Sequence, residues 1–290
     1  MLLRTRAPAK INLTLHVQRR RLDGFHDLES LVAFAGVADI LELAPGRPLA
    51  LTVDGPTAAQ AGVLADNLVL RATAKLAALV PGLVTGAFRL TKRLPVGAGI
   101  GGGSSDAAAA LRLLARLNDL SLSDQRLHEA ARQTGSDVPV CLVPRTRMMR
   151  GTGDELARHH APARPVYAVL VNPGVHLDTR LVFGAMGLGM GQEVALEPHP
   201  IIDDRLDHQT FFQKLRAGRN DMQAAACGLA PAIDGVLRTL NQIDDAGLVR
   251  MSGSGSTCFA LFGDRGSARR AAGAIGREPR GWWIRTTVLM

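Results

Sequence analysis

Five glycines crowd the short segment between residues 97 and 103 of this 290-residue chain, which reads GAGIGGG. Two serines, an aspartate and the run AAAALRLLARL follow at once, and that run is typical of a helix. Glycines let backbone N–H groups converge without obstruction by β-carbons, and the N-terminus of a helix attracts anions. The segment therefore predicts a phosphate-binding loop joined to a helix.

We expect this helix to span residues 106–117, capped at its N-terminus by Ser104, Ser105 or Asp106, because Ser and Asp are favoured N-cap residues. A flexible solvent loop is the alternative without function, and the helix that follows argues against it. The predicted phosphate-binding residues are Pro95, Val96, Gly97, Ala98, Gly99, Ile100, Gly101, Gly102, Gly103, Ser104 and Ser105.

Two common phosphate motifs fit this loop poorly. A Walker loop fails because no lysine follows the glycines. The dinucleotide fingerprint G-x-G-x-x-G is spelled from Gly97 to Gly102, but Pro95 separates it from any strand. The acidic residue expected about 20 positions on would be Asp119, which lies in a polar loop. Hydride transfer is therefore the minor alternative.

Strand and helix patterns are interspersed along the chain. Residues 11–17 alternate apolar and polar side chains, which predicts a half-buried strand with Lys10 and Asn12 on one face. Further strands are expected at 39–44, 50–53, 87–91, 166–171 and 258–262, and helices at 67–79, 124–133 and 232–240. Without a strict βαβ repeat, this order favours an α+β fold.

A change of composition divides the chain. Residues 145–164 are rich in Arg, Gly, His and Pro, and a strand pattern resumes at Pro165. We place the boundary there, giving an N-terminal lobe at 1–160 and a C-terminal lobe at 161–290. Residues 184–204 lack periodicity and predict a long loop.

Three segments in order resemble the motifs of the GHMP kinase family. They are APAKINLTLHV at 7–17, PVGAGIGGGSS at 95–105 and MSGSGSTCFALF at 251–262. The resemblance implies two lobes, an ATP-binding N-terminal lobe like ribosomal protein S5 domain 2 and a ferredoxin-like C-terminal lobe. The last strand can return to the N-terminal lobe. ATP and Mg²⁺ are the implied cofactors, with Asn67 near the adenine and Ser105 a possible Mg²⁺ ligand.

One further segment indicates the substrate. DGFHDLESL at 23–31 resembles the cytidine-recognition segment of a GHMP branch that phosphorylates a cytidine diphosphate derivative in isoprenoid precursor biosynthesis. This implies that Phe25, His26 and Phe183 contact the cytosine. Phe25 stands where the branch has Tyr, so stacking survives but a hydroxyl hydrogen bond does not. A phenylalanine such as Phe183 is more often a core residue.

The resemblance also names a catalytic pair. Phosphoryl transfer to an alcohol needs charge neutralisation and often an acceptor for the proton. The segment GSDVPVCL assigns this base role to Asp137, which from sequence alone could equally cap a turn. Lys10 is one of four lysines in an arginine-rich chain and is expected to orient Asp137 and the hydroxyl. A surface lysine is the alternative, and Asn12 is expected to bind substrate.

The third motif and the composition complete the expectations. Gly253 and Gly255 predict either a close backbone approach to the phosphate loop or a plain turn. Net charge is +8, but scattered arginines and 4% aromatic residues argue against nucleic acid. Without an apolar run of about 18 residues we expect no membrane contact and a cytoplasmic protein. Cys141, Cys227 and Cys258 are expected to be buried thiols.

Two other functions remain open. One is a GHMP kinase that acts on homoserine or mevalonate, and the other is a relative that binds nucleotide without catalysis.

Overall fold

The structure is a computed structural model that describes residues 1–63, 66–159, 165–202, 206–276 and 281–289. It divides into two compact units. The first comprises Met1–Lys10, Val37–Val96 and Gly101–Pro144, and the second comprises Ile11–Gly36, Gly97–Ile100 and Arg145–Met290. The lobe boundary expected between residues 160 and 161 lies outside the described residues and stays a prediction.

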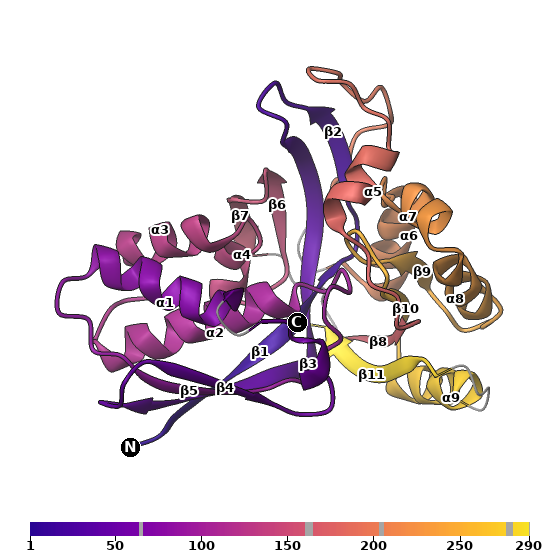
Figure 1. Cartoon of the computed structure of the whole chain (residues 1–290). Coiled ribbons are helices and arrows are strands. Elements are labelled where there is room, and N and C mark those ends of the chain that lie inside the picture. The colour runs from indigo at the N-terminus through magenta and orange to yellow at the C-terminus, as the bar shows by residue number, and fades with distance from the viewer. Residues whose placement is uncertain (64–65, 160–164, 203–205, 277–280, 290) are drawn as a thin grey trace. The chain divides into compact units, whose positions relative to one another are not determined.

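Helices cover one side of a sheet in the first unit (Figure 1). β5 (Gly86–Thr91) pairs parallel with β4 (Ala50–Asp54) and antiparallel with the end of β3 (His26–Pro45), while β1 (Leu3–Asn12) also pairs with β3. The helices are α1 (Leu68–Leu79), α2 (Gly102–Leu117), α3 (Gln125–Thr134) and α4 (Val138–Leu142).

Local sequence explains how these helices form. The Asn67 side chain accepts a hydrogen bond from the Val69 N–H at the start of α1, and Asp124 does the same for Arg126 at the start of α3. The alanine run of α2 is fully buried, and small side chains let neighbouring helices approach closely. The first unit therefore packs around α2.

Two sheets carry the second unit. β2 (His16–Arg20) and β6 (Arg147–Gly151) both pair antiparallel with the first half of β3, and β7 (Glu155–His159) pairs with β6. The other sheet is antiparallel with the order β11 (Trp283–Leu289), β8 (Val166–Asn172), β10 (Cys258–Phe262) and β9 (Leu248–Met251). Leu289 of β11 also pairs with Ala35 of β3.

One apolar core joins this second sheet to its helices. Val169, Ala260 and Phe262 pack there against Val236 and Ala271. These last two residues come from α8 (Pro231–Asn241) and α9 (Arg265–Ile275). The remaining helices of the unit are α5 (Thr179–Ala185), α6 (His208–Ala217) and α7 (Gln223–Leu229).

The α+β prediction is confirmed, but one local expectation is wrong. The strand expected at 11–17 is broken, since β1 ends at Asn12 and β2 begins at His16, and residues 7–17 are buried on both faces. The strand expected at 39–44 is confirmed as the end of the longer, 20-residue β3. Alternation alone cannot show that a polar residue is buried by a partner strand. Lys10 and Asn12 do both lie in β1.

The three cysteines are free thiols, and Cys227 is only half-buried, contrary to expectation. Among the described residues, none of the helices has the length and apolar character needed to cross a bilayer.

Candidate active site

The glycine segment forms a loop that leads into α2. Gly97, Gly99 and Gly101 have φ angles of +61°, +72° and +59°, a region that residues with side chains rarely adopt. The N-cap of α2 is Gly101 and no side chain caps it, so the predicted cap by Ser104, Ser105 or Asp106 is wrong. The helix begins four residues earlier than expected because the glycines themselves form its first turn. The unpaired N–H groups of that turn suit an anion.

Residues 97–100 pack within the second unit against the turn after β9. The Gly99 carbonyl accepts a hydrogen bond from the Ser252 hydroxyl at 2.9 Å, and the Ala98 carbonyl accepts one from the Thr257 N–H at 3.1 Å. A β-carbon at Gly99 would lie 2.4 Å from the Ser252 carbonyl oxygen, and one at Gly253 would lie 2.8 Å from that of Gly99. The predicted close approach of the third motif to the loop is confirmed.

His176 also packs on this loop, and sequence reasoning missed it. A β-carbon at Gly97 would lie 2.0 Å from Nδ1 of His176, so the ring rests on the glycine backbone. His176 directly follows the segment NPGV and is exposed. No signal in the sequence could have found it, because His176 lies far from Gly97 along the chain.

Lys10 and Asp137 form an ion pair in the first unit. Nζ of Lys10 lies 2.6 Å from Oδ1 of Asp137, and Lys10 is 3% exposed, so the surface-lysine alternative is wrong. Asp137 stands at the N-terminus of α4 and its side chain makes no capping hydrogen bond there. Its side chain stays 35% exposed and can reach a substrate. A β-carbon at Gly101 would lie 3.1 Å from Cβ of Lys10, which places this lysine beside the start of α2.

A second buried lysine lies at the start of the same helix. Nζ of Lys92 contacts Asp39 at 2.5 Å and Asp106 at 2.8 Å, and all three side chains are buried. The other oxygen of Asp39 accepts the N–H groups of Arg93 and Leu94, where the loop begins. Desolvation raises the pKa of Asp106 to about 7, while the Lys92 charge opposes the rise and the Asp39 charge adds to it.

Sequence reasoning missed this buried triad, which we define as Asp39, Lys92 and Asp106. Lys92 is one of four lysines in the chain, and Asp106 was predicted only as a possible N-cap or first residue of the helix. The triad connects the entry of the loop to α2 and so positions the predicted phosphate site.

Two asparagines were predicted to bind ligands. Asn12 Nδ2 donates to the Ser30 hydroxyl, while its Oδ1 is buried with no hydrogen-bond partner in the described part of the chain. That acceptor is available for a hydroxyl. Asn67 is the N-cap of α1 and uses Oδ1 to accept the Val69 N–H, which leaves its amide hydrogens to face a base. Both ligand roles stay predictions.

The predicted cytosine contacts lie in the second unit. The rings of His26 and Phe183 stack with centroids 4.2 Å apart and planes 10° apart. Phe183 of α5 also packs against the core, so a core position and the predicted contact with cytosine are compatible. Phe25, which precedes His26 in the sequence, is 60% exposed. Burial, with a smaller effect of the Arg20 charge, lowers the pKa of His26, so its ring is neutral at pH 7.

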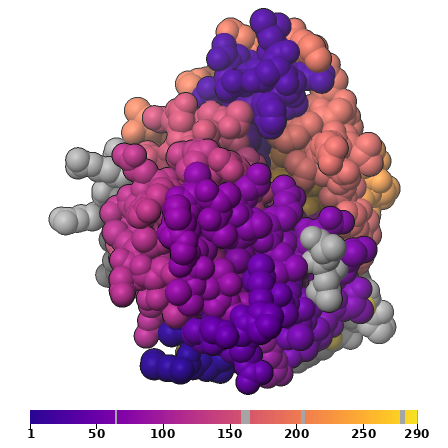
Figure 2. All heavy atoms as spheres, turned by 60° about the vertical axis from the view of Figure 1, so that its left-hand side comes forward, coloured from indigo at the N-terminus to yellow at the C-terminus, as the bar shows by residue number. Residues whose placement is uncertain are grey.

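The tip that carries Phe25 and His26 is fastened to the segment after α5. The Arg20 N–H donates to the Gln192 carbonyl at 2.9 Å, and the Gly191 N–H donates to the Arg20 carbonyl at 2.8 Å. Figure 2 shows this indigo tip beside the salmon segment. These hydrogen bonds restrain the two segments that carry the stacked rings of His26 and Phe183.

The metal prediction for Ser105 is not decided by its contacts. Its hydroxyl is fully buried and donates to the Pro8 carbonyl at 2.7 Å. Within the described ranges there is no cluster of three His, Cys, Asp or Glu side chains that could hold a metal. Mg²⁺ in kinases commonly takes one or two carboxylates and completes its shell with phosphate oxygens and water. The Ser104 hydroxyl, in the first turn of α2, is a side-chain oxygen of the kind that such a shell can include.

Comparisons with known proteins agree with this geometry. The family model described as GHMP kinases N terminal domain matches residues 67–145, and the model GHMP kinases C terminal matches residues 204–280. The chain is 57% identical over 289 residues to a 4-diphosphocytidyl-2-C-methyl-D-erythritol kinase of Methylobacterium radiotolerans, covering 99% of each chain. It is 52% identical to the protein of that name from Azorhizobium caulinodans, covering 98% of each.

Solved structures show the same fold. A crystal structure of 4-(cytidine 5'-diphospho)-2C-methyl-D-erythritol kinase matches with a TM-score of 0.73 and 34% identity over 99% of both chains. Homoserine kinase from Cytophaga hutchinsonii matches with a TM-score of 0.71 at 18% identity, over 100% of this chain and 94% of that one. At 18% identity, the similarity to homoserine kinase shows a shared fold and nothing more.

The contact of Gly99 with backbone atoms predicts a severe effect of a single methyl group. Gly99→Ala should raise the KM for nucleotide on the order of tenfold or more, because neither Ser252 nor Gly255 can move away cheaply. Gly82→Ala is the matched control, since Gly82 has a φ of +75° and open space around it. It should cost only the strain of a left-handed residue, about 1–2 kcal/mol of stability. Equal effects of the two variants on nucleotide KM would contradict the steric explanation.

The buried triad predicts a pH-dependent stability. Since folding raises the pKa of Asp106 above its ordinary value of 3.8 to about 7, its contribution is complete below pH 3.8 and is lost as pH rises through 7. From pH 5 to pH 8 the protein should lose roughly 3 kcal/mol of unfolding free energy relative to Asp106→Asn. Urea unfolding at several pH values measures this, and parallel curves for the two proteins would exclude the titration of Asp106.

Proposed function

The chain belongs to the GHMP kinase family, and on that premise we propose that it transfers the γ-phosphoryl group of ATP to the 2-hydroxyl of 4-diphosphocytidyl-2-C-methyl-D-erythritol. The observation that carries the proposal is the Lys10–Asp137 pair in a chain 57% identical over its length to a kinase of that name. The reaction belongs to isoprenoid precursor biosynthesis. It takes place in the cytoplasm and needs neither nucleic acid nor membrane.

Asp137 accepts the proton of the attacking hydroxyl. One oxygen of its carboxylate is held by Lys10, which leaves the second oxygen for the substrate. A general base must lie within hydrogen-bond reach of the proton that it takes, and the exposed fraction of this side chain allows that. The ion pair fixes the carboxylate so that one orientation persists through the reaction.

Lys10 has a second task. Its ammonium group lies at the end of a buried side chain that passes Gly101, at the positive end of α2. Charge that spreads over the transferred group is stabilised there by a fixed cation and by backbone N–H groups. Because both are in place before the reaction, they cost no reorganisation at the transition state.

The loop from Pro95 to Ser105 holds the phosphates of ATP. Gly97, Gly99 and Gly101 have no side chains that could cover the backbone N–H groups. The first N–H groups of α2 have no partner within the helix and point outward from it. His176 adds an imidazole beside Gly97. Mg²⁺, when bound, would neutralise the phosphate charge, and the Ser104 hydroxyl in the first turn of α2 is the side chain that would hold it. Ser105 keeps its hydroxyl on Pro8 and supports this turn from behind.

His26 and Phe183 recognise the cytosine. A neutral imidazole offers one donor and one acceptor, and Nε2 of His26 is buried without a hydrogen-bond partner among the described residues. The stack on Phe183 fixes the plane of the ring. Phe25 supplies an exposed aromatic face on which a base can stack, and Asn12 offers its free Oδ1 to a hydroxyl.

The activity is tested by coupled ADP release from the purified chain. We expect turnover with 4-diphosphocytidyl-2-C-methyl-D-erythritol and none above background with homoserine or mevalonate, because His26 and Phe183 have no base to contact in the smaller substrates. Turnover of homoserine or mevalonate alone would replace the proposed substrate. ATP binding without turnover of any of the three would favour a nucleotide-binding relative without catalysis.

Asp137→Asn tests the base. The amide keeps the size of the side chain but cannot accept the proton, so kcat should fall by about 10²- to 10⁴-fold while the affinity for ATP is unchanged. Asp119→Asn is the control, since Asp119 is exposed in a loop of the same unit. Near-normal turnover in a folded Asp137→Asn protein would remove Asp137 from this role.

A further inference from the structure

Arg20 lies opposite His26 across two paired strands of the second unit. β2 and β3 run antiparallel, and Arg20 and His26 are partners in their register. Side chains at opposite positions of an antiparallel pair leave the sheet on the same face, with β-carbons about 4.5–5.5 Å apart. The Arg20 side chain therefore lies on the same side of the sheet as the imidazole that stacks on Phe183.

The charge of Arg20 is not neutralised by a carboxylate. Arg19 leaves the strand on the opposite face and pairs with Asp27 at 2.5 Å. For Arg20, the residues that the structure describes supply no such ion pair, and its side chain is half-buried. Burial lowers the pKa of His26, and the Arg20 charge lowers it further. The imidazole of His26 thus experiences a cation that nothing nearby cancels.

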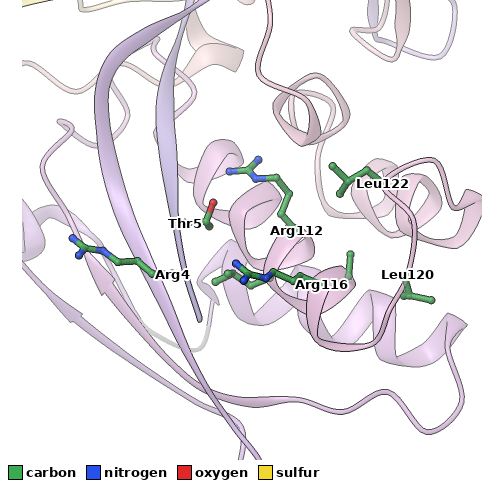
Figure 3. A pocket seen from close by; sticks show the side chains of 8 residues that line it. Arg4, Thr5, Arg112, Arg116, Leu120 and Leu122 are labelled. Carbon is green, nitrogen blue, oxygen red and sulfur yellow. The ribbon is translucent and has the colours of Figure 1, made fainter. Parts of the chain in front are cut away.

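The hydrogen bonds of Arg20 set it apart from other buried arginines. Arg112 lines a cavity of about 270 Å³ in the first unit (Figure 3), and both of its terminal nitrogens donate to main-chain carbonyls. Arg250 of β9 is held in the same way in the second unit. Nη1 of Arg20 donates to the Leu188 carbonyl at 2.9 Å, but its Nε is buried with no hydrogen-bond partner in the described part of the chain. An arginine N–H can only donate, so this Nε requires an acceptor.

The imidazole of His26 carries an atom that can be that acceptor. Its Nε2 is also buried and has no hydrogen-bond partner within the described ranges. A nearby positive charge favours a lone pair on this nitrogen over an N–H group, whether Arg20 reaches it directly or through a water molecule. The proton of a neutral imidazole then lies on Nδ1. Because Nε2 is shielded from solvent, Nδ1 is the ring nitrogen left for a ligand.

We propose that Arg20 fixes the proton of His26 on Nδ1 and thereby makes the site select cytosine over uracil, which rests on the cytidyl substrate proposed above. N3 of cytosine has no hydrogen and accepts from Nδ1–H, whereas N3 of uracil carries a hydrogen that would oppose it. Without the charge of Arg20 either ring nitrogen can carry the proton, and an unprotonated Nδ1 accepts from uracil. Arg20 acts through His26 and is a positioning residue.

The position of the proton is measured on the full chain without substrate. In ¹⁵N NMR of histidine-labelled protein, protonated and unprotonated ring nitrogens give separate resonances, and His26→Gln assigns those of His26. At pH 8 we expect the proton on Nδ1 in the parent and in Arg19→Gln, and a mixture of both forms in Arg20→Gln. A proton on Nε2 in the parent, or identical His26 resonances in the parent and Arg20→Gln, overturns the proposal.

Selectivity is measured as the ratio of kcat/KM for the cytidyl substrate to that for its uridyl counterpart. Arg20→Gln should lower this ratio roughly tenfold, through the KM of these two substrates and with unchanged KM for ATP. Arg19→Gln should leave the ratio unchanged, since its side chain lies on the other face. A parent chain that does not prefer the cytidyl substrate would also overturn the proposal.

Arg20→Lys separates the charge from the hydrogen bond to Leu188. Glutamine keeps a donor for that carbonyl but no charge, whereas lysine keeps a cation opposite His26 and should retain most of the selectivity. Equal losses in the two variants, with urea midpoints that fall together, would reduce Arg20 to a structural role. Turnover of neither nucleotide substrate would refute the proposed function alone, since the resonances of His26 still decide the role of Arg20.

Discussion

The start of α2 lies between two buried ammonium groups, and the phosphate-binding geometry depends on this arrangement. Lys10 passes Gly101 and pairs with Asp137, while Lys92 lies 3.6 Å from where a β-carbon of Gly102 would stand and pairs with Asp39 and Asp106. A buried cation left without its partner costs about 3–5 kcal/mol, so each lysine requires its carboxylates. Gly101 therefore does more than expose an N–H group, because a β-carbon there would crowd Lys10.

Much of this site was predictable because its parts are local in sequence. The loop, the helix that follows it and the shared strand of Lys10 and Asn12 each rest on spacing within a few residues. The base role of Asp137 came only from resemblance. Its contact with Lys10 joins residues 127 positions apart, and no periodicity reports such a distance. The α+β class was predicted from the order of strands and helices. That order stays the same when the predicted ends of the elements are wrong by a few residues.

The failures have a common physical origin in tertiary contacts. The N-cap at Ser104 to Asp106 was wrong because Gly101 can adopt a left-handed conformation and start the helix earlier. The strand at 11–17 was wrong because Thr14 bonds across to Leu31, which breaks β1 from β2. His176 and the triad of Asp39, Lys92 and Asp106 act through packing partners far away in the chain. Sequence patterns describe one element at a time and do not show which elements meet.

Two hydrogen bonds fasten α2 to β1 and so position the helix that carries the start of the predicted phosphate site. Ser105 donates to the Pro8 carbonyl and Arg112 donates to that of Arg6, and positions seven apart in a helix lie on one face. The first bond lies at the phosphate end of α2 and the second lies two turns on. The same strand carries Lys10, so the two bonds fix α2 relative to this lysine along two turns of the helix.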